Sequence, residues 1–384
     1  MDKTAPAVAA LPRRVRLKTL LLCGGRKSRL WPESTSSLPG QFVGGQDSLV
    51  YRAYQRLRHS KFLREEDIIF TLLESQRGLL ESLLGVVPDE RLILQAQEER
   101  TLVALAAAAR CLQDVDNCVL ASVPCDHWVP DDEESRLQEA LVFGAQAAFQ
   151  ENRLVILGAS IRRPETGFGY VMVQPGAHEH ISLPGKAGGP TYRLYKAERF
   201  EEKPDASRAQ QYMRDGRWFW NTDIIVCRPR VLLQELAHHH PALRRLLDDI
   251  SGPEWVRHLF LRSQPSTPAK DLLSRSGNVH VMPVPFLWDD TGTWAGRAQV
   301  AEDSNQTDQN NNTKAQRGQS LVFLDAKGTF IHSHGDRTIA VVGLNDIVIV
   351  DAKDALLVCA KANATEVGAV PAVLAATPAP KTEP

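Results

Sequence analysis

The chain has 384 residues, of which 43% are hydrophobic and 24% charged, and its formal net charge at pH 7 is −1. This length suits one large domain plus a smaller one, and the composition is typical of a soluble globular protein. The small net charge argues against nucleic acid or an anionic membrane as a bulk partner, and no apolar run is long enough to predict a transmembrane helix.

The six cysteines are scattered along the chain and form no Cys-x-x-Cys pair. Most of them fall in apolar runs, which predicts reduced core thiols in a cytoplasmic protein and no zinc site. The N-terminus lacks the order of a signal peptide. We expect residues 1–15 to be a disordered leader, and residues 369–384, which are rich in alanine, proline and threonine, to be a disordered tail.

Strand and helix patterns alternate through the first half of the chain. Short apolar runs predict strands, and longer amphipathic or alanine-rich runs predict helices. The predicted strands are residues 19–23, 67–71, 91–94, 117–124 and 154–159, and the predicted helices are residues 48–57, 76–84, 101–112 and 135–150. This alternation predicts an α/β fold with a doubly wound, mostly parallel sheet that binds ligands at the carboxyl ends of its strands.

The first predicted strand ends in Gly24 and Gly25, and Arg29 follows shortly after. Because the two glycines have no Cβ, backbone N–H groups can approach a ligand closely there, and phosphates tend to bind at such strand ends. Arg29 has the geometry to hold a phosphate with two hydrogen bonds. An ordinary strand-to-loop turn with a surface arginine fits the glycine pair as well.

Two aspartates follow later strand patterns. Asp126 lies in VPCDH, just after the strand at 117–124, where a carboxylate can reach a metal. Mg²⁺ prefers one or two carboxylates together with substrate phosphates. A helix cap or a turn aspartate fits Asp126 equally well. Asp290 lies in WDDTGTW after a strand-like run at 279–286, and by itself this segment is typical of an Asp-Thr-Gly turn.

The segment RRPETGFGYVMV at 162–173 combines two glycines with Glu165. The glycines let the backbone run against a flat polar ligand such as a sugar, and Glu165 can accept hydrogen bonds from sugar hydroxyls. A β-hairpin with glycine turns fits the same residues, and both interpretations can hold together. Residues 176–191, rich in glycine and proline, are expected to be a flexible insertion.

The second half begins with the acidic-basic run around Glu202 and Lys203. The carboxylate can bind sugar hydroxyls and the ammonium a phosphate, although a solvated charge run fits as well. Residues 206–214, 231–239 and 255–261 are predicted helices. The triple histidine at 238–240 cannot share one helix face, so we expect a solvated or interfacial cluster. After a polar linker at 303–314, short apolar runs separated by turn residues predict a small C-terminal β domain.

Several of these motifs together resemble the signature of the sugar-1-phosphate nucleotidyltransferases, and within them the mannose-1-phosphate guanylyltransferases. The matching segments are GG-x-x-x-RLWP-x-S at 24–34, Pro-x-Gln-Phe at 39–42, VPCDH at 123–127, RRPETGFGY at 162–170, F-x-EKP at 200–204, Trp-Asn at 220–221 and W-x-D-x-G-x-W at 288–294. The resemblance implies a Rossmann-like nucleotidyltransferase domain at 16–303 and a β-helix-like domain at 304–368.

The resemblance also implies that the protein converts GTP and mannose 1-phosphate into GDP-mannose and pyrophosphate, with Mg²⁺ as cofactor. It implies that Asp126 and Asp290 bind the metal, and that the catalytic residues are Arg29, Asp126, Asp290 and Lys203. The nucleotide is expected to contact Gly24, Gly25, Lys27, Arg29 and Gln41. The sugar is expected to contact Glu165, Thr166, Gly167, Gly169, Tyr170, Glu202, Lys203 and Asn221. A homo-oligomer remains open, and no nucleic acid or membrane partner is expected.

The chain departs from the family pattern at a few of these positions. Gly40 stands where the family has a lysine that neutralises phosphate charge, Lys27 and Asp223 stand where it has glycines, and Glu99-Arg100 replaces Arg-Asn. Losing one phosphate cation typically costs about 10²–10³ in rate, and Lys27 is near enough in sequence to restore the charge. Two alternatives stay open: a catalytically weak or inactive relative that binds nucleotide sugar as a regulatory or assembly subunit, and a nucleotidyltransferase for another sugar 1-phosphate or NTP.

Overall fold

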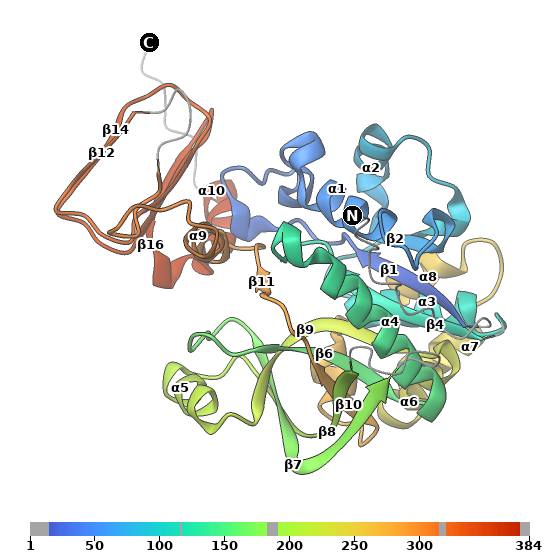
Figure 1. Cartoon of the computed structure of the whole chain (residues 1–384). Helices are drawn as coiled ribbons and strands as arrows, with labels where there is room; N and C mark the ends of the chain where they lie inside the picture. The colour runs from blue at the N-terminus through green and yellow to red at the C-terminus, as the bar shows by residue number, and fades with distance from the viewer. Residues whose placement is uncertain (1–14, 116, 183–190, 315–319, 377–384) are drawn as a thin grey trace, which may run out of the picture. The chain divides into compact units, whose positions relative to one another are not determined.

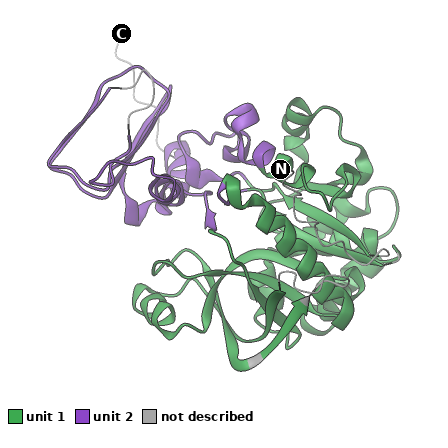
Figure 2. Cartoon of the chain, in the orientation of Figure 1, with its two compact units in different colours: residues 1–25, 53–125, 131–287 green, residues 26–52, 126–130, 288–384 purple. Residues whose placement is uncertain are grey.

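A computed structural model describes residues 15–115, 117–182, 191–314 and 320–376. The chain divides into two compact units, shown in Figure 2: unit 1 comprises residues 1–25, 53–125 and 131–287, and unit 2 comprises residues 26–52, 126–130 and 288–384. The predicted leader up to residue 14 and the predicted tail beyond residue 376 lie outside the described residues. The segment after the glycine pair therefore groups with the C-terminal strands.

The large sheet of unit 1 has the strand order β3-β2-β1-β4-β9-β6-β10-β8-β7. Its strands are β1 (Arg16–Leu22), β2 (Ile68–Leu73), β3 (Leu92–Gln95), β4 (Cys118–Pro124), β6 (Leu154–Ser160), β7 (Gly169–Ser182), β8 (Thr191–Glu202), β9 (Trp218–Cys227) and β10 (Val279–Pro283). The helices of the chain are α1 (Leu49–Arg58), α2 (Arg77–Leu84), α3 (Thr101–Leu112), α4 (Glu134–Glu151), α5 (Ala206–Asp215), α6 (Pro229–His239), α7 (Pro241–Asp249), α8 (Trp255–Arg262), α9 (Trp294–Asp303) and α10 (Val370–Ala376). The α/β class is thus confirmed (Figure 1).

The strand directions are more mixed than the sequence predicted. Strands β1 to β4 pair in parallel, as do β6 and β10. Strand β9, however, runs antiparallel to both β4 and β6 between them, and β7 and β8 form an antiparallel hairpin. The β9 segment WFWNTDIIVC carries no directional signal of its own, because strand direction depends on which neighbours it meets in the sheet.

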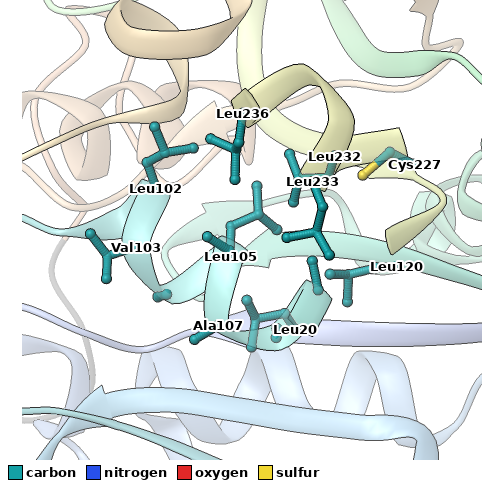
Figure 3. Close-up of a cluster of buried hydrophobic side chains, with 14 of the residues drawn as sticks. Leu20, Leu102, Val103, Leu105, Ala107, Leu120, Cys227, Leu232, Leu233 and Leu236 are labelled. Carbon is teal, nitrogen blue, oxygen red and sulfur yellow. The ribbon is translucent and has the colours of Figure 1, made fainter. Parts of the chain in front are cut away.

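Helices cover both faces of this sheet. Leu105 of α3 and Leu232 of α6 pack with Ile225 in one buried cluster, part of which Figure 3 draws. The neighbouring residue Val226 faces the other way, where it meets Gly144 of α4. Since successive side chains of a strand point to opposite faces, α4 lies on the face opposite to α3 and α6. This is the layer arrangement expected of a doubly wound sheet.

The β7–β8 hairpin corrects one expectation about the middle of the chain. Residues 176–182, expected to be part of a flexible insertion, continue strand β7 and pair with β8, for example Glu179 with Leu194. Residues 183–190 of the expected insertion lie outside the described residues. The strand continues past Pro175 and Gly176 with a register shift between Val173 and His178, which is how a sheet edge accommodates such residues.

Unit 2 contains a small C-terminal β domain, as predicted. Its strands are β12 (Leu321–Leu324), β13 (Phe330–Ser333), β14 (Ile339–Val342), β15 (Ile347–Asp351) and β16 (Leu356–Ala360). Leu321 pairs in parallel with Ile339, and Phe330 pairs in parallel with Val348, so each turn of chain takes 18 residues. Stacked parallel turns of constant length are the geometry of a β-helix, and Figure 1 shows them in orange and red.

Helix α10 occupies residues 370–376 of the segment expected to be a disordered tail. Its alanines favour the helix, and Pro371 is tolerated because it lies in the first turn. Among the described residues, no helix is both long and apolar enough to cross a membrane.

Candidate active site

Two short strands of unit 2 bring the predicted metal ligands together. Strand β5 (His127–Trp128) pairs antiparallel with β11 (Asp289–Asp290), so that Asp290 lies opposite His127. The Thr291 N–H and hydroxyl both donate to the Asp126 carbonyl oxygen, at 2.9 and 2.7 Å. These backbone contacts join two segments that are more than 160 residues apart in the sequence. As a result, the carboxylates of Asp126 and Asp290 are neighbours.

Gly292 shows how close the two carboxylates are. A Cβ built at this position would collide with Oδ2 of Asp126 and would lie 2.9 Å from Oδ1 of Asp290. The Gly292 N–H donates to Asp290 Oδ1 at 2.6 Å. Any larger residue would therefore push the carboxylates apart, which gives the glycine of the W-x-D-x-G-x-W segment a physical role.

Lys27 supplies the positive charge next to this pair. Its ammonium forms a short ion pair with Oδ2 of Asp126, which is buried. Burial raises the pKa of Asp126, but the charges of Lys27, His127 and Arg29 outweigh that effect and hold the pKa below its usual range. Burial and the neighbouring Asp126 charge raise the pKa of Asp290 to about 7. The two carboxyls therefore have very different proton affinities.

The arrangement fits a hard divalent cation. Two adjacent carboxylates provide oxygen ligands, and the burial and neighbouring negative charge that raise the pKa of Asp290 both disfavour its ionised form, which a bound cation would stabilise. Lys27 offsets part of that negative charge with a single positive charge. Asp126 and Asp290 are therefore the residues that could hold Mg²⁺.

We expect the apparent Mg²⁺ affinity to rise with pH up to about pH 7 and then to level off. Protons and Mg²⁺ compete for Asp290, whose pKa is about 7 in the folded protein, so one bound proton must leave below that pH. This predicts about a tenfold gain in affinity per pH unit below pH 7. Without metal, the same shift lowers the free energy of unfolding as the pH rises from about 4 to about 7, because the carboxyl of the unfolded chain ionises first.

Isothermal titration calorimetry with Mg²⁺ on both sides of pH 7 measures this dependence. Asp290→Asn removes the titrating group and one charged ligand, so this variant should bind Mg²⁺ weakly at every pH. An affinity of the natural chain that does not change across pH 7 would show that Asp290 does not take up a proton in competition with the ion.

The predicted nucleotide-binding residues are placed as follows. Gly24 lies tightly against Gln95 in unit 1, where a Cβ would come within 2.7 Å of the Gln95 amide nitrogen. Gly25 has φ +78° and its carbonyl accepts a hydrogen bond from Gln76. The side chain of Gln41 is fully buried. Thus Gly24 is required for internal packing, and a nucleotide cannot reach Gln41 in this conformation.

Arg29 lies in unit 2, in a short 3-10 turn at Ser28–Leu30. Its aliphatic stem and the Ser28 hydroxyl lie against Gly368, where a Cβ would come within 3.1 Å of the Arg29 Cγ. The charge of Arg29 acts on both Asp126 and Asp290: it helps to lower the pKa of Asp126 and partly opposes the rise in the pKa of Asp290. Arg29, Lys27 and the two carboxylates therefore form one electrostatic cluster.

The structure also explains why Gly40 has no side chain. A Cβ at this position would lie 3.0–3.1 Å from Leu30 and 3.2 Å from Ser34, and its N–H donates to the Ser34 hydroxyl at 3.0 Å. Leu30 is fully buried and has little room to move. The lysine that the family has here therefore does not fit into this loop as it stands.

We expect Gly40→Lys to destabilise the protein by about 1–3 kcal/mol, because it overpacks a crowded site. The exposed neighbour Ser36 provides the matched control, since Ser36→Lys adds the same charge without a clash. Urea unfolding of both variants measures the difference. Equal midpoints would mean that the loop opens freely and that crowding does not explain the glycine.

The first group of predicted sugar-binding residues lies in the loop before β7 and at the start of that strand, in unit 1. Glu165 accepts hydrogen bonds from the Gly167 N–H at 2.9 Å and from the Arg163 guanidinium at 3.2 Å. The Tyr170 hydroxyl donates to the Glu165 carbonyl at 2.6 Å, and its ring is fully buried. Thr166 is exposed. Tyr170 therefore supports the loop from the buried side, while Glu165 and Thr166 lie where a ligand can reach them.

The second group lies on β8 and β9. The carboxylate of Glu202 rests against Gly169, where a Cβ would meet Oε2 at 2.8 Å, and burial raises its pKa. The Lys203 side chain is 62% exposed and its ammonium lies 4.0 Å from Glu202. Lys203 is therefore the residue of this group that is most free to meet a phosphate.

The Asn221 side chain is hydrogen-bonded to Asp223, the residue that stands where the family has glycine. Its amide donates to Oδ1 of Asp223 at 2.6 Å, and its Oδ1 accepts from the Asp223 N–H at 3.1 Å. Asp223 has φ +55°, a conformation that glycine adopts easily and aspartate tolerates. This conformation explains why the family has glycine at this position, and in this chain the aspartate engages one N–H group and one oxygen lone pair of the amide that was expected to bind the sugar.

Arg100 is a structural residue in this conformation. Its guanidinium donates to the carbonyl of Glu98 at 2.6 Å and to that of Ser263 at 3.3 and 3.4 Å. Arg100, which stands where the family has the asparagine of its Arg-Asn pair, therefore holds the start of α3 to a neighbouring loop.

Sequence reasoning missed a few residues of the site. Gly292 keeps the carboxylates close, and Arg163 lies over the Trp220 ring at 5.1 Å beside Glu165. The glycine of W-x-D-x-G-x-W was quoted in the motif, and its spacing from Asp290 was the available signal. The arginine also lies in a quoted motif, RRPETGFGY, but its contact with Trp220 had no signal, because Trp220 lies on a strand more than 50 residues later.

Two family models match the chain. The nucleotidyl transferase family matches residues 18–307, which is more than half of the chain, and the MannoseP isomerase/GMP-like beta-helix domain matches residues 319–371. The chain therefore belongs to the nucleotidyl transferase family and continues into a β-helix domain. The resemblance to the sugar-1-phosphate nucleotidyltransferases is thereby confirmed.

Three individual proteins are similar to this chain over most of its length. The xanthan biosynthesis protein XanB of Xanthomonas campestris pv. campestris is 30% identical over 352 residues, which cover 88% of this chain and 69% of XanB. A mannose-1-phosphate guanylyltransferase of Klebsiella pneumoniae is 26% identical over 358 residues, covering 89% and 70%. The crystal structure of a mannose-1-phosphate geranyltransferase from Thermus thermophilus is similar with a TM-score of 0.74 and 27% identity, covering 94% of this chain and 99% of that one.

Proposed function

We propose that the protein makes GDP-mannose and pyrophosphate from GTP and mannose 1-phosphate, with Mg²⁺ as cofactor. The observation that carries this proposal is the cluster of Lys27, Asp126 and Asp290 in a chain of the nucleotidyl transferase family. Relatives named for mannose-1-phosphate guanylyl transfer support the choice of sugar and base.

In this reaction a phosphate oxygen of mannose 1-phosphate attacks the α-phosphorus of GTP, and the bond to the pyrophosphate leaving group breaks. A sugar phosphate is already a competent nucleophile, so the protein has to align the substrates and neutralise charge rather than remove a proton. Mg²⁺, when bound by Asp126 and Asp290, neutralises phosphate charge. Arg29 and Lys27 add positive charge for the triphosphate.

The sugar phosphate is assigned to the residues of unit 1. Glu165 presents a carboxylate beside the exposed Thr166, and the exposed ammonium of Lys203 is available for the phosphate. The contact with Asp223 uses one N–H group and one oxygen lone pair of the Asn221 amide, so it fixes the orientation in which the remaining N–H and lone pair can meet a sugar hydroxyl.

That same hydrogen bond favours a second candidate function. Asn221 is hydrogen-bonded to Asp223, and the loop at Gly40 has no room for a lysine. Both features fit a weak or inactive relative that binds nucleotide sugar as a regulatory or assembly subunit. A third candidate is transfer to another sugar 1-phosphate or from another NTP, since base choice follows from none of the contacts described above.

One assay separates these candidates. Purified protein is incubated with Mg²⁺, mannose 1-phosphate and each NTP in turn, and pyrophosphate release is followed. Turnover with GTP alone supports the proposal. No turnover together with tight GDP-mannose binding in calorimetry supports the second candidate, and turnover that prefers another pair of substrates supports the third. Asp126→Ala serves as the background control for contaminating activity.

A further inference from the structure

A second group of metal-ligand side chains lies in unit 2, apart from the aspartate pair. Glu33 follows the RLWP segment directly, His332 lies in β13, and His334 follows that strand. One ligand atom from each residue lies within 4.8 Å of the other two. We propose that Glu33, His332 and His334 bind one divalent transition-metal ion, such as Zn²⁺, which ties the segment after Leu30 to the β-helix strands.

The distances suit such an ion. Glu33 Oε1 lies 3.6 Å from His332 Nε2 and 3.4 Å from His334 Nε2. Zn²⁺ binds nitrogen and oxygen at about 2.0–2.2 Å, so two ligands of a tetrahedral site are about 3.3 Å apart. Two of the three pairs are thus close to their bound separation. The ligand atoms of the third pair, His332 and His334, lie within 4.8 Å of each other, and His334 is exposed.

The strand pattern explains why the two histidines meet. Residues two apart in an extended chain point to the same side, and His332 and His334 lie edge to face with ring centroids 4.8 Å apart. The His332 ring also lies against Trp294 at 5.1 Å, and the Trp294 indole donates to the Trp31 carbonyl at 2.8 Å. Such surroundings fix the orientation of a metal-binding imidazole.

The burial and surroundings of the Glu33 carboxylate favour the binding of a cation. Its side chain is only 9% exposed, and its Oε1 is buried without a hydrogen-bond partner among the described residues. The nearest partners of this oxygen are the two histidine nitrogens at 3.4 and 3.6 Å, so a metal bond would supply the close polar contact that a buried carboxylate oxygen requires.

The proposed ion would have a structural consequence for the loop that carries Lys27 and Arg29. Leu30 already packs with Trp294, Phe330 and Val348 in one buried cluster, and Glu33 lies four residues beyond Arg29. A metal bond at Glu33 adds a second link at the other end of this loop. The cysteine pattern predicted no zinc site, because these ligands are imidazoles and a carboxylate from distant segments.

Untagged full-length protein titrated with Zn²⁺ in excess Mg²⁺ tests the proposal by calorimetry and thermal unfolding, since Mg²⁺ keeps Asp126 and Asp290 occupied. We expect one Zn²⁺ per chain and a raised Tm. Glu33→Gln and the exposed His334→Ala should each weaken Zn²⁺ binding by more than about 100-fold, because losing even a supporting partner costs about 10–100-fold. The exposed His238→Ala is the matched control and should bind as the natural chain does.

Cobalt substitution identifies the ligands. Co²⁺ at this site should show d–d absorption without a thiolate-to-cobalt charge-transfer band, which distinguishes it from binding at a cysteine. Absence of Zn²⁺ binding, unchanged binding in His334→Ala, or a thiolate band would each overturn the proposal. A change of Tm in His334→Ala without any Zn²⁺ binding by the natural chain would leave a plain ion pair between Glu33 and the histidines, which also overturns it.

Discussion

Asp126→Ala is expected to lower kcat of nucleotidyl transfer by at least about 10³-fold and to remove the Mg²⁺-dependent gain in Tm. The substitution deletes one of two adjacent carboxylates that could hold the ion, and it leaves the Lys27 ammonium without its partner. Metal and charge stabilisation of a phosphoryl group contribute several kcal/mol to such reactions, and each 1.36 kcal/mol corresponds to a factor of about ten.

Asp132→Ala is the matched control for this prediction. Asp132 is an exposed carboxylate six residues further along the chain, so its loss changes the net charge equally without touching the pair. Both variants are compared in pyrophosphate release and in thermal unfolding with and without Mg²⁺. If Asp126→Ala kept its response to Mg²⁺, the ion would bind elsewhere and the assignment of the aspartate pair would be wrong.

Lys27→Gly is expected to lower kcat/KM by about 10²–10³-fold, the usual cost of losing a phosphate cation. Lys27 adopts φ +50°, so glycine removes the charge while suiting the backbone better than alanine does. Without the lysine, the two carboxylates also repel each other more strongly, and Mg²⁺ should bind more tightly. Loss of activity together with tighter Mg²⁺ binding is therefore the expected signature.

Lys27→Ala and Lys27→Arg complete this comparison. Lys27→Ala removes the same charge and should lower turnover at least as far as Lys27→Gly, whereas Lys27→Arg keeps the charge and should retain most of the turnover. Turnover in Lys27→Ala equal to that of the natural chain would end the idea that this residue replaces the lysine absent at Gly40.

Much of the fold was readable because its signals are local. Helix α3 was predicted at its observed bounds, since alanine and leucine favour a helix without help from distant residues. The same holds for the order of strands and helices from β1 to β6, except for the two-residue strand β5, which was not predicted. The direction of β9 was not readable, because it depends on pairing with β4 and β6. The extension of β7 was hidden by glycine and proline, which usually indicate loops.

In the candidate site, too, residues in local motifs could be predicted and contacts between distant residues could not. Asp126 and Asp290 were found through their motifs, and their proximity follows from the β5–β11 pairing. The contact of Asn221 with Asp223 was not foreseen, because a side chain that replaces a glycine reveals its hydrogen bond only in three dimensions. Glu33 escaped notice for a related reason, since its histidine neighbours lie about 300 residues later.

The crowding around Gly40 has a consequence for how this protein could evolve. Because Leu30 and Ser34 fill the space beside the Gly40 Cα, lysine at this position costs stability until one of them becomes smaller. The order of substitutions therefore matters. Laboratory selection for faster turnover should accordingly recover new positive charges at open positions of the loop more readily than lysine at residue 40, unless Leu30 or Ser34 has first been replaced by a smaller residue.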